Sequence, residues 1–409
     1  MYPCNVVSAP LSHSQVRSQF PALGSGFAFL ENAGGSQLPS CVINAMTSFL
    51  RESYVQTTAG YPASDRATQT GTDAHAVVAT LMGAGDKGTV VLGPSTTQLM
   101  VTLASCYAQT IVPGDEIIVS IANHEANAGP WAKLDRVGAS VKWWGIDNES
   151  GDMSLGELEK LLTPRTRIVA FPHTSNLLGN IVDVAAVTEL CHAYGARVVV
   201  DGVAYAPHAL IEAAKWNVDY YAFSHYKVYG PHMAALYADH QSLSELEGPN
   251  HFFIDPSDVP HVFELGCLSW EGCAGVVALG DYLKAMTGHT SFNRQTVERA
   301  TDMMREWERP LMKRFLEFLL SKPTVRLVGP TSLERVPTFS FLTSKHSSSF
   351  VAAEVNRQNM GVRNGHMYSH RLTEALGVST VEGFVRVSAV HYNSVEEIDR
   401  VCEVLDPLI

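Results

Sequence analysis

The sequence has no long apolar run, no paired cysteine motif and no excess of positive charge. No stretch approaches the roughly 18 consecutive apolar residues that a membrane-spanning helix requires. The seven cysteines are scattered, and no two have the CxxC spacing of redox and zinc motifs. The first residues show no basic stretch followed by an apolar run, so we expect no secretory signal. These absences predict a reduced, soluble, cytoplasmic protein with no membrane partner.

Acidic residues outnumber basic ones, with 41 Asp and Glu against 29 Lys and Arg and a formal net charge of −12. This balance argues against a nucleic-acid partner, because such proteins rely on Lys and Arg to neutralise phosphates. The composition is 46% hydrophobic and 17% charged, which is typical of a folded globular protein. A chain of 409 residues exceeds the size at which one core stops growing, so two domains are expected.

Seven short β-rich runs, several of them almost wholly apolar, alternate with stretches of helical periodicity in the first two thirds of the chain. Strands that are apolar throughout are typical of a parallel sheet buried on both faces. The sequence therefore predicts an α/β fold, with a mostly parallel seven-stranded sheet and helices on both faces. A (β/α)8 barrel would require the alternation to continue to the end of the chain, and it does not. The predicted strands are residues 89–93, 116–120, 140–144, 167–171, 197–201, 218–223 and 234–238.

The pattern changes after about residue 275 and predicts a smaller C-terminal α+β domain. We assign residues 20–280 to a large domain that binds the cofactor, and residues 1–19 with 281–409 to the small domain. The small domain's expected elements are a long helical segment at 275–321, strands near 325–328 and 337–342, a helix near 349–358, a loop at 361–371 and a strand in 384–390.

Hydroxyl side chains follow the predicted strand 89–93, where a helix begins. Ser95, Thr96 and Thr97 would offer hydroxyls and free N–H groups to a phosphate. The simpler interpretation is an ordinary helix cap. Residues 83–88 (GAGDKG) match GxGxxG, but they precede a strand and follow a helical stretch, which is the wrong context for a dinucleotide motif. We interpret them as a turn.

Further polar residues follow other strands of the predicted sheet. Because ligands bind at the carboxyl ends of the strands in such sheets, His124 and Asn176 are candidates for the same crevice. Each also has a plain alternative, a structural loop histidine and a turn asparagine. Strand 218–223 leads directly to Ser224, Tyr226 and Lys227.

Asp201 is the only acid at the end of its apolar strand, and 26 residues separate it from Lys227. That separation suits a crossover to a neighbouring parallel strand, so both side chains could line one pocket. A buried carboxylate needs a cation or several donors, and an Asp201–Lys227 ion pair is one solution. Another is pyridoxal 5'-phosphate (PLP), which needs an amine for a Schiff base, a carboxylate for its ring nitrogen and a phosphate site. We predict PLP as the cofactor, with Lys227 as its covalent anchor.

The chain resembles the class V aminotransferase superfamily, in its cysteine-desulfurase-like branch. The resemblance covers about residues 27–405 and implies PLP fold type I, as a homodimer with shared active sites. It implies that Lys227 forms the Schiff base, Asp201 faces the ring nitrogen, His124 stacks on the ring and Asn176 lies beside the ring oxygen. It also implies that Ser224, Thr96 and Thr97 hold the phosphate, and that Arg386 binds the substrate carboxylate unless it forms a structural salt bridge. The segments that carry it are NAGGSQLP (32–39), GPSTTQL (93–99), NHEAN (123–127), SNLLGNI (175–181), DGVAYAPH (201–208), FSHYKVYGPH (223–232) and VRVSAVHYN (385–393).

The chain departs from the desulfurase pattern at four positions. Tyr368 stands where the persulfide-forming cysteine is expected, and no cysteine lies between 273 and 402. Ala204 replaces the expected Gln, Tyr226 replaces the His before the lysine, and Cys267 replaces the Thr that the partner chain would supply. These departures argue against sulfur relay through a cysteine.

Some segments also resemble the decarboxylating aldol enzyme of ustiloxin biosynthesis. Our leading hypothesis is a PLP-dependent lyase that acts on a small α-amino acid, by β-elimination, C–S cleavage or decarboxylative carbanion chemistry. An aminotransferase or epimerase, or a catalytically silent PLP-binding protein, remains as an alternative. We expect no metal site, and expect the loop 361–371 and the segment 264–273 to shape the substrate pocket. The predicted catalytic residues are Lys227, His124, Tyr226 and Tyr368, and the predicted substrate-binding residues are Arg386, Asn176 and Arg363.

Overall fold

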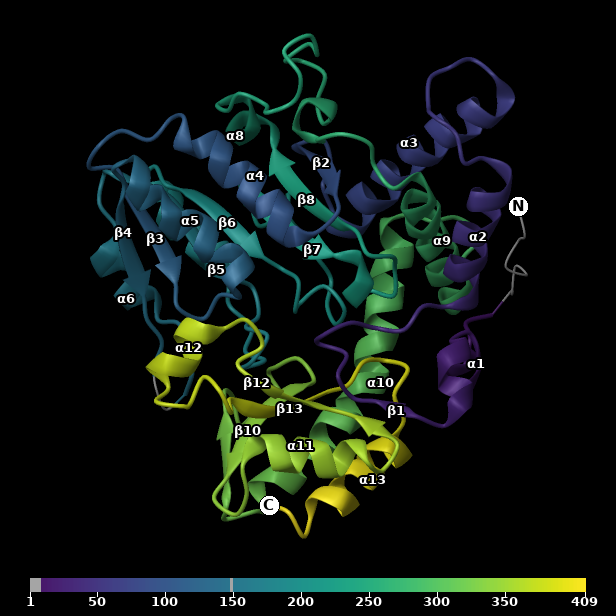
Figure 1. The fold of residues 1–409 in the computed structure, drawn as a ribbon, viewed down its shortest axis with the longest axis vertical. Coiled ribbons are helices and arrows are strands. Elements are labelled where there is room, and N and C mark those ends of the chain that lie inside the picture. Colours follow the sequence, from purple (N-terminus) through teal and green to yellow (C-terminus); the bar gives the residue numbers. More distant parts are fainter. Residues whose placement is uncertain (1–8, 148–149) are drawn as a thin grey trace.

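The computed structural model describes residues 9–147 and 150–409 of the chain. Figure 1 shows a large sheet with its helices in the upper half and a small sheet in the lower half, and the long helix α10 (Arg294–Leu320) extends between them. The predicted α/β fold with a mostly parallel seven-stranded sheet is confirmed. Of the segment 1–19 that we assigned to the small domain, residues 1–8 lie outside the described residues, as does Cys4.

All seven predicted strands form the large sheet, in the order β2-β8-β7-β6-β5-β3-β4. β8 runs antiparallel to both of its neighbours, and the remaining pairs are parallel. The strands are β2 (Gly88–Gly93), β3 (Glu116–Ser120), β4 (Ser140–Trp144), β5 (Thr166–Pro172), β6 (Arg197–Asp201), β7 (Tyr220–Ser224) and β8 (Ala234–Asp239).

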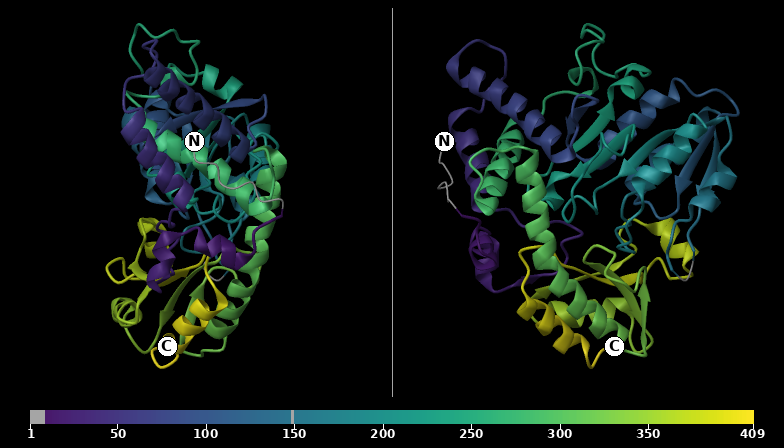
Figure 2. Two further views of the ribbon diagram at one scale, coloured as in Figure 1. Left: turned by 90° about the vertical axis from the view of Figure 1, so that its right-hand side faces the viewer. Right: turned by 180° about the vertical axis from the view of Figure 1, so that it is seen from behind.

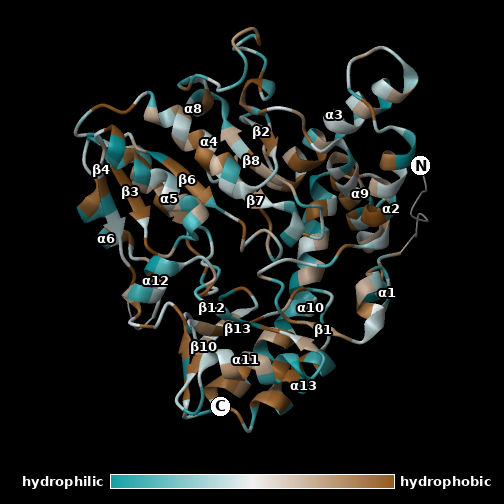
Figure 3. Ribbon diagram, viewed as in Figure 1, coloured by the Kyte–Doolittle hydropathy of each residue, from teal (hydrophilic) through white to brown (hydrophobic). Residues whose placement is uncertain are grey.

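Helices cover both faces of this sheet, and successive strand residues pack against opposite layers. In β6, Val198 and Val200 join a core with α3, α7 and α9, whereas Val199 joins a second core with α4 and α5. Burial on both sides explains why most of these strands are largely apolar, and β3 and β6 are mostly brown in Figure 3. β4 lies at the edge of the sheet and is only partly buried. The covering helices are α3 (Pro62–Met82), α4 (Thr96–Ala108), α5 (Gly129–Ala132), α7 (Val184–Ala193) and α9 (Trp270–Thr287).

The small sheet has four antiparallel strands in the order β12-β13-β10-β9. Its apolar face packs on the second half of α10 and on α11 and α13, which gives this part of the chain its own core. Figure 2 shows this lower unit from two further directions. The elements are β9 (Val325–Val328), β10 (Thr338–Thr343), α11 (Ser348–Asn356), β11 (Met360–Gly361), β12 (Arg363–Gly365), β13 (Phe384–Ser388) and α13 (Val395–Leu405).

Two expectations for this region were wrong. The helical segment 275–321 is two helices, because Gly288 caps the end of α9 and the Asn293 side chain accepts from the Thr296 N–H at the start of α10. The loop 361–371 contains strand residues, because 363–365 pair with β13. Edge strands this short carry little signal of their own, since their pairing is set by tertiary contacts.

The N-terminal segment connects the small sheet to the end of β7. β1 (Ala28–Phe29) pairs with β11, Glu31 bridges to Ser388 of β13, and the Ser36 N–H donates to the Tyr226 carbonyl. The carboxyl ends of β5, β6 and β7 therefore lie near the small sheet. The remaining helices are α1 (His13–Ser18), α2 (Ser40–Glu52), α6 (Leu155–Leu161), α8 (His240–Ser244) and α12 (His370–Ala375).

Two negative findings apply to the described part of the chain. None of its helices combines the length and the apolar character needed to cross a membrane. The six cysteines that it contains form no disulfide.

Candidate active site

A cavity lies at the carboxyl ends of β5, β6 and β7, next to the first turn of α4. The structure brings together here most of the side chains that the sequence predicts for the site. These cavity-lining residues are Thr96, Thr97, His124, Asn176, Asp201, Ser224, Tyr226 and Lys227.

Lys227 and Asp201 are both buried in this cavity, and they do not form an ion pair. Lys227 ends a short 3-10 turn after β7, and its ammonium has no hydrogen bond or ion pair with any residue that the structure describes. Burial, with a smaller contribution from Arg386, lowers the pKa of Lys227 to about 8. Asp201 accepts a hydrogen bond from the Val203 N–H at 2.9 Å, and burial raises the pKa of its carboxyl. The simple ion-pair interpretation therefore does not hold.

Hydroxyl groups gather where α4 begins. Ser95 caps this 13-residue helix by accepting from the Gln98 N–H, and the hydroxyls of Thr96 and Ser224 lie 2.8 Å apart. The first N–H groups of a helix have no partners within it, and the helix dipole makes this end positive. The arrangement suits a phosphate group.

His124 and Asn176 lie beside the lysine, each with partners of its own. The His124 Nδ1 accepts from the Ala126 N–H at 3.1 Å, and burial, followed by the charges of Lys227 and Arg386, lowers the pKa of His124 to about 3. His124 is therefore neutral at physiological pH. Asn176 donates to the Met367 carbonyl at 2.8 Å and accepts from the Ser369 hydroxyl at 2.7 Å. It holds the segment 361–371 against the cavity.

Arg386 lies at the small-sheet side of the cavity and is 2% exposed. It donates to the Asn176 carbonyl at 3.2 Å and to a Glu31 carboxylate oxygen at 3.3 Å. Its Nε has no partner among the described residues. The exposed Arg363 is paired with Arg386 across β12 and β13, and its guanidinium lies 3.5 Å from the same Glu31 oxygen. Both predicted substrate-binding arginines therefore share one carboxylate.

Tyr368 lies at the mouth of the site, with its ring centroid 5.3 Å from that of His124. Its side chain is 61% exposed, and both Met367 and Tyr368 have left-handed backbone angles. Such conformations are unfavourable for non-glycine residues and gather at functional sites. Arg371 and Glu125 form an ion pair near this mouth.

Sequence reasoning missed two residues of this region. Thr174 lines the cavity with a buried hydroxyl that has no partner among the described residues. It belongs to the same PHTSN run after β5 from which we selected only Asn176. Glu31, which binds both arginines, precedes the NAGGSQLP segment, and no local signal marked it.

Several polar groups of the cavity are not fully satisfied by the protein, and together they fit PLP. An unpaired lysine, a buried carboxylate with one hydrogen bond, an orphaned hydroxyl and a positive helix end are the groups that this cofactor needs. All of them line one cavity.

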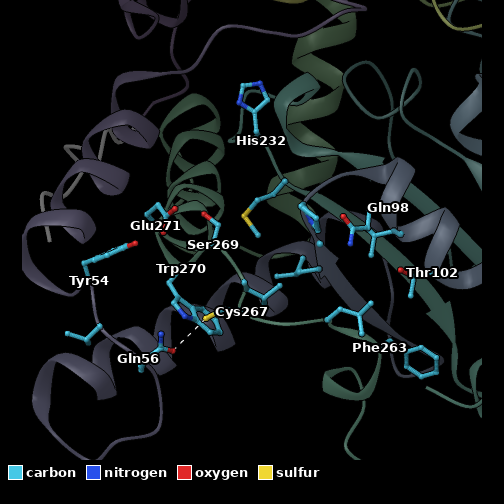
Figure 4. Close-up of a pocket in the computed structure, with 18 residues that line it drawn as sticks. Tyr54, Gln56, Gln98, Thr102, His232, Phe263, Cys267, Ser269, Trp270 and Glu271 are labelled. Carbon is cyan, nitrogen blue, oxygen red and sulfur yellow. Dashed lines mark hydrogen bonds between the residues drawn. The ribbon is translucent and has the colours of Figure 1, made fainter. Parts of the chain in front are cut away.

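A larger cavity of about 660 Å³ also borders the beginning of α4, and Figure 4 shows its lining. The segment 264–273 borders this cavity through Cys267, Trp270 and Glu271, and the Cys267 thiol lies 3.6 Å from the Gln56 amide oxygen. Neither Lys227 nor Asp201 lines it. The segment 264–273 thus borders a different cavity from the one that holds the lysine.

Comparisons with known proteins identify the family of this chain. The sequence model of the family described as Aminotransferase class-V matches residues 28–401. The aminotransferase-like protein FGM3 of Gibberella zeae is 37% identical over 413 residues, which cover 98% of this chain and 100% of FGM3. The cysteine desulfurase-like protein ustD of Aspergillus flavus is 32% identical, over 96% of this chain and 90% of ustD.

A solved structure shares the whole fold. The apo structure of a cysteine desulfurase from Thermococcus onnurineus NA1 has a TM-score of 0.87 and 25% sequence identity, with 98% of this chain and 99% of that chain covered. The predicted fold type and resemblance are therefore confirmed. The chain belongs to the class V aminotransferase family, in its cysteine-desulfurase-like branch of PLP-dependent enzymes.

Proposed function

We propose that this chain binds PLP covalently through Lys227 and acts as a lyase on a small α-amino acid. The observation that carries the proposal is a buried amine and a buried carboxylate that line one cavity without pairing. Burying two ionisable groups that do not pair with each other costs free energy, unless a ligand between them interacts with both. A protonated ring nitrogen for Asp201 and an aldehyde for Lys227 would satisfy both.

The residues around the cavity have distinct proposed tasks in holding the cofactor. PLP supplies an electron sink for the electrons released at the substrate's α-carbon. Asp201 keeps the ring nitrogen protonated, and the hydroxyls of Thr96, Thr97 and Ser224 bind the phosphate with the N–H groups of α4. The neutral ring of His124 is suited to stacking, because a charged ring there would be poorly solvated.

Other residues bind the substrate and move protons. Arg386 binds the substrate carboxylate, a task for which the guanidinium fork is suited. Lys227 has a pKa near 8, so its amine can both accept and return a proton at the α-carbon close to neutral pH. Tyr226 and Tyr368 are the further groups to which we assign proton transfer at the mouth of the site.

The segment 361–371 supports a lyase without sulfur relay. It contains no cysteine, and Tyr368 presents an exposed phenol beside His124. A phenol cannot accept sulfur as a persulfide. We therefore propose that the enzyme releases a β-substituent or carbon dioxide from its substrate directly.

The test replaces the lysine. Lys227→Ala should abolish both the visible absorbance of the protein-bound cofactor and all turnover, because the covalent link is lost. Lys215→Ala, which removes an exposed lysine paired with Glu212, is the matched control and should retain both. The enzyme is incubated with each member of a panel of amino acids, and the products are identified. Release of carbon dioxide, or of pyruvate with sulfide, supports a lyase, whereas stoichiometric pyridoxamine phosphate indicates an aminotransferase. Normal turnover in Lys227→Ala would contradict the proposal.

A further inference from the structure

Glu31 occupies the position at which a substrate carboxylate is expected. Its Oε1 lies 3.3 Å from the Arg386 guanidinium and 3.5 Å from that of Arg363. The Arg386 Nε has no partner among the described residues, so the binding capacity of this guanidinium is not filled. A substrate carboxylate that approaches Arg386 therefore meets a carboxylate of the protein itself.

The two arginines make a carboxylate at this place necessary. Arg363 and Arg386 are directly opposite on β12 and β13, and like charges in such a pair destabilise a sheet. Arg386 is buried, and a buried charge without a counterion is costly. Glu31 relieves both problems, and one unit of positive charge remains on the three side chains together. That remaining charge suits one incoming carboxylate.

Gly34 allows Glu31 to take this position. The Gly34 N–H donates to the Glu31 carbonyl at 2.9 Å, so the chain turns back on itself here. A Cβ at position 34 would lie 2.2 Å from the Glu31 Oε1. Any side chain at position 34 would thus displace the carboxylate, which is the movable end of a flexible side chain.

We propose that Glu31 is a displaceable internal competitor that occupies Arg386 in the resting enzyme and moves onto Arg363 when the substrate carboxylate binds. This inference rests on the proposed role of Arg386 in substrate binding. Glu31 sets the affinity for the substrate carboxylate, and Arg363 is the residue that accepts Glu31 rather than a direct substrate ligand.

Burial and exposure give the exchange its direction. Arg386 is 3% exposed at its side chain and Arg363 is 53% exposed. A carboxylate interacts more strongly with the buried Arg386 than with the exposed Arg363. The substrate can take Arg386 because Glu31, unlike the substrate, has Arg363 as a second partner. Glu31 is 34% exposed and already within reach of Arg363, so its transfer to that surface residue costs little.

The experiment measures carboxylate binding to the full-length, PLP-loaded protein by calorimetric titration with propionate. Propionamide, which has the same shape without the charge, is the neutral control. Glu31→Gln should tighten propionate binding by roughly tenfold. Arg363→Gln should weaken it, because Glu31 then has no second partner. The double variant should bind propionate as tightly as Glu31→Gln alone. A double variant that stays weak would show that Arg363 contacts the ligand itself and would overturn the proposal.

Two further variants control for structural damage. Glu125→Gln removes another carboxylate near the mouth of the site. Because Glu125 pairs with Arg371 and not with Arg386, this variant should leave propionate affinity unchanged. Gly34→Ala retains the charge of Glu31 but pushes its carboxylate away from Arg386. This variant should also tighten propionate binding. Unchanged affinity in both Glu31→Gln and Gly34→Ala would refute the competitor role. The visible absorbance of the bound cofactor is recorded separately, so a failure of the Lys227 proposal is distinguishable from a failure of this one.

Discussion

At the scale of single residues, the unpartnered hydroxyl of Thr174 predicts opposite effects of its removal on protein stability and on cofactor affinity. In the cofactor-free protein this buried group has no partner among the described residues, which costs on the order of 1 kcal/mol or more. Thr174→Val should therefore raise the free energy of unfolding of the cofactor-free protein by about 1 kcal/mol. The same variant should weaken PLP binding by roughly fivefold, because one hydrogen bond to the ligand is lost.

Urea unfolding and a spectroscopic titration with PLP measure these two effects. Thr174→Ser keeps the hydroxyl and should change cofactor affinity little. If Thr174→Val leaves cofactor affinity unchanged, the hydroxyl does not serve the ligand.

The site residues on the large sheet could be predicted because they follow strands that are easy to recognise. Asp201 is the only acid in its segment VVVDGVAYAPH, and Lys227 follows another apolar strand, so topology alone brings them near each other. Glu31 could not be predicted in this way. It reaches Arg386 through long-range pairing with β13, and no local sequence pattern encodes that contact.

At the scale of elements, the junction of β12 and β13 depends on Gly383. Its φ is +58°, and a Cβ there would lie 2.0 Å from the Gly365 carbonyl carbon. Gly383→Ala should lower the free energy of unfolding by at least about 3 kcal/mol, because backbone strain and a collision add together. Gly377 is the matched control, since its φ is +68° with nothing within 4 Å of a Cβ.

Gly377→Ala should cost only about 1 kcal/mol, the cost of strain alone. Denaturant unfolding compares the two variants. Equal losses would mean that Gly365 moves aside and that this close approach is not important for the small sheet.

The same contrast explains which elements could be predicted. Most strands of the large sheet are buried on both faces, so their sequences are largely apolar runs. β12 consists of Arg363, Asn364 and Gly365 at a sheet edge, and its pairing depends on β13 and on the glycine contact. Such a strand has no periodic signal to read.

At the scale of the whole molecule, buried histidines make stability depend on pH. Burial lowers the pKa of His173 to about 3 and that of His225 to about 4. Between pH 6.5 and these values the unfolded chain binds protons that the folded chain does not, so stability falls as pH falls. Burial raises the pKa of the acids Asp201 and Glu308, and these act in the opposite sense. Substitution of a single histidine isolates the contribution of that residue to the pH dependence of stability.

His225 is the best residue for this test, because it is fully buried and neither ring nitrogen has a hydrogen-bond partner among the described residues. At pH 5 its contribution to the loss of stability is about 2 kcal/mol, from 1.36 kcal/mol for each pH unit below roughly 6.5. His225→Leu should therefore reduce the difference in the free energy of unfolding between pH 7 and pH 5 by about that amount. Urea unfolding at the two pH values measures it, and any constant effect of the substitution cancels in the difference. His346→Gln, at an exposed position, should leave the difference unchanged. An unaltered pH dependence in His225→Leu would mean that this ring is protonated in the folded protein, contrary to the burial argument.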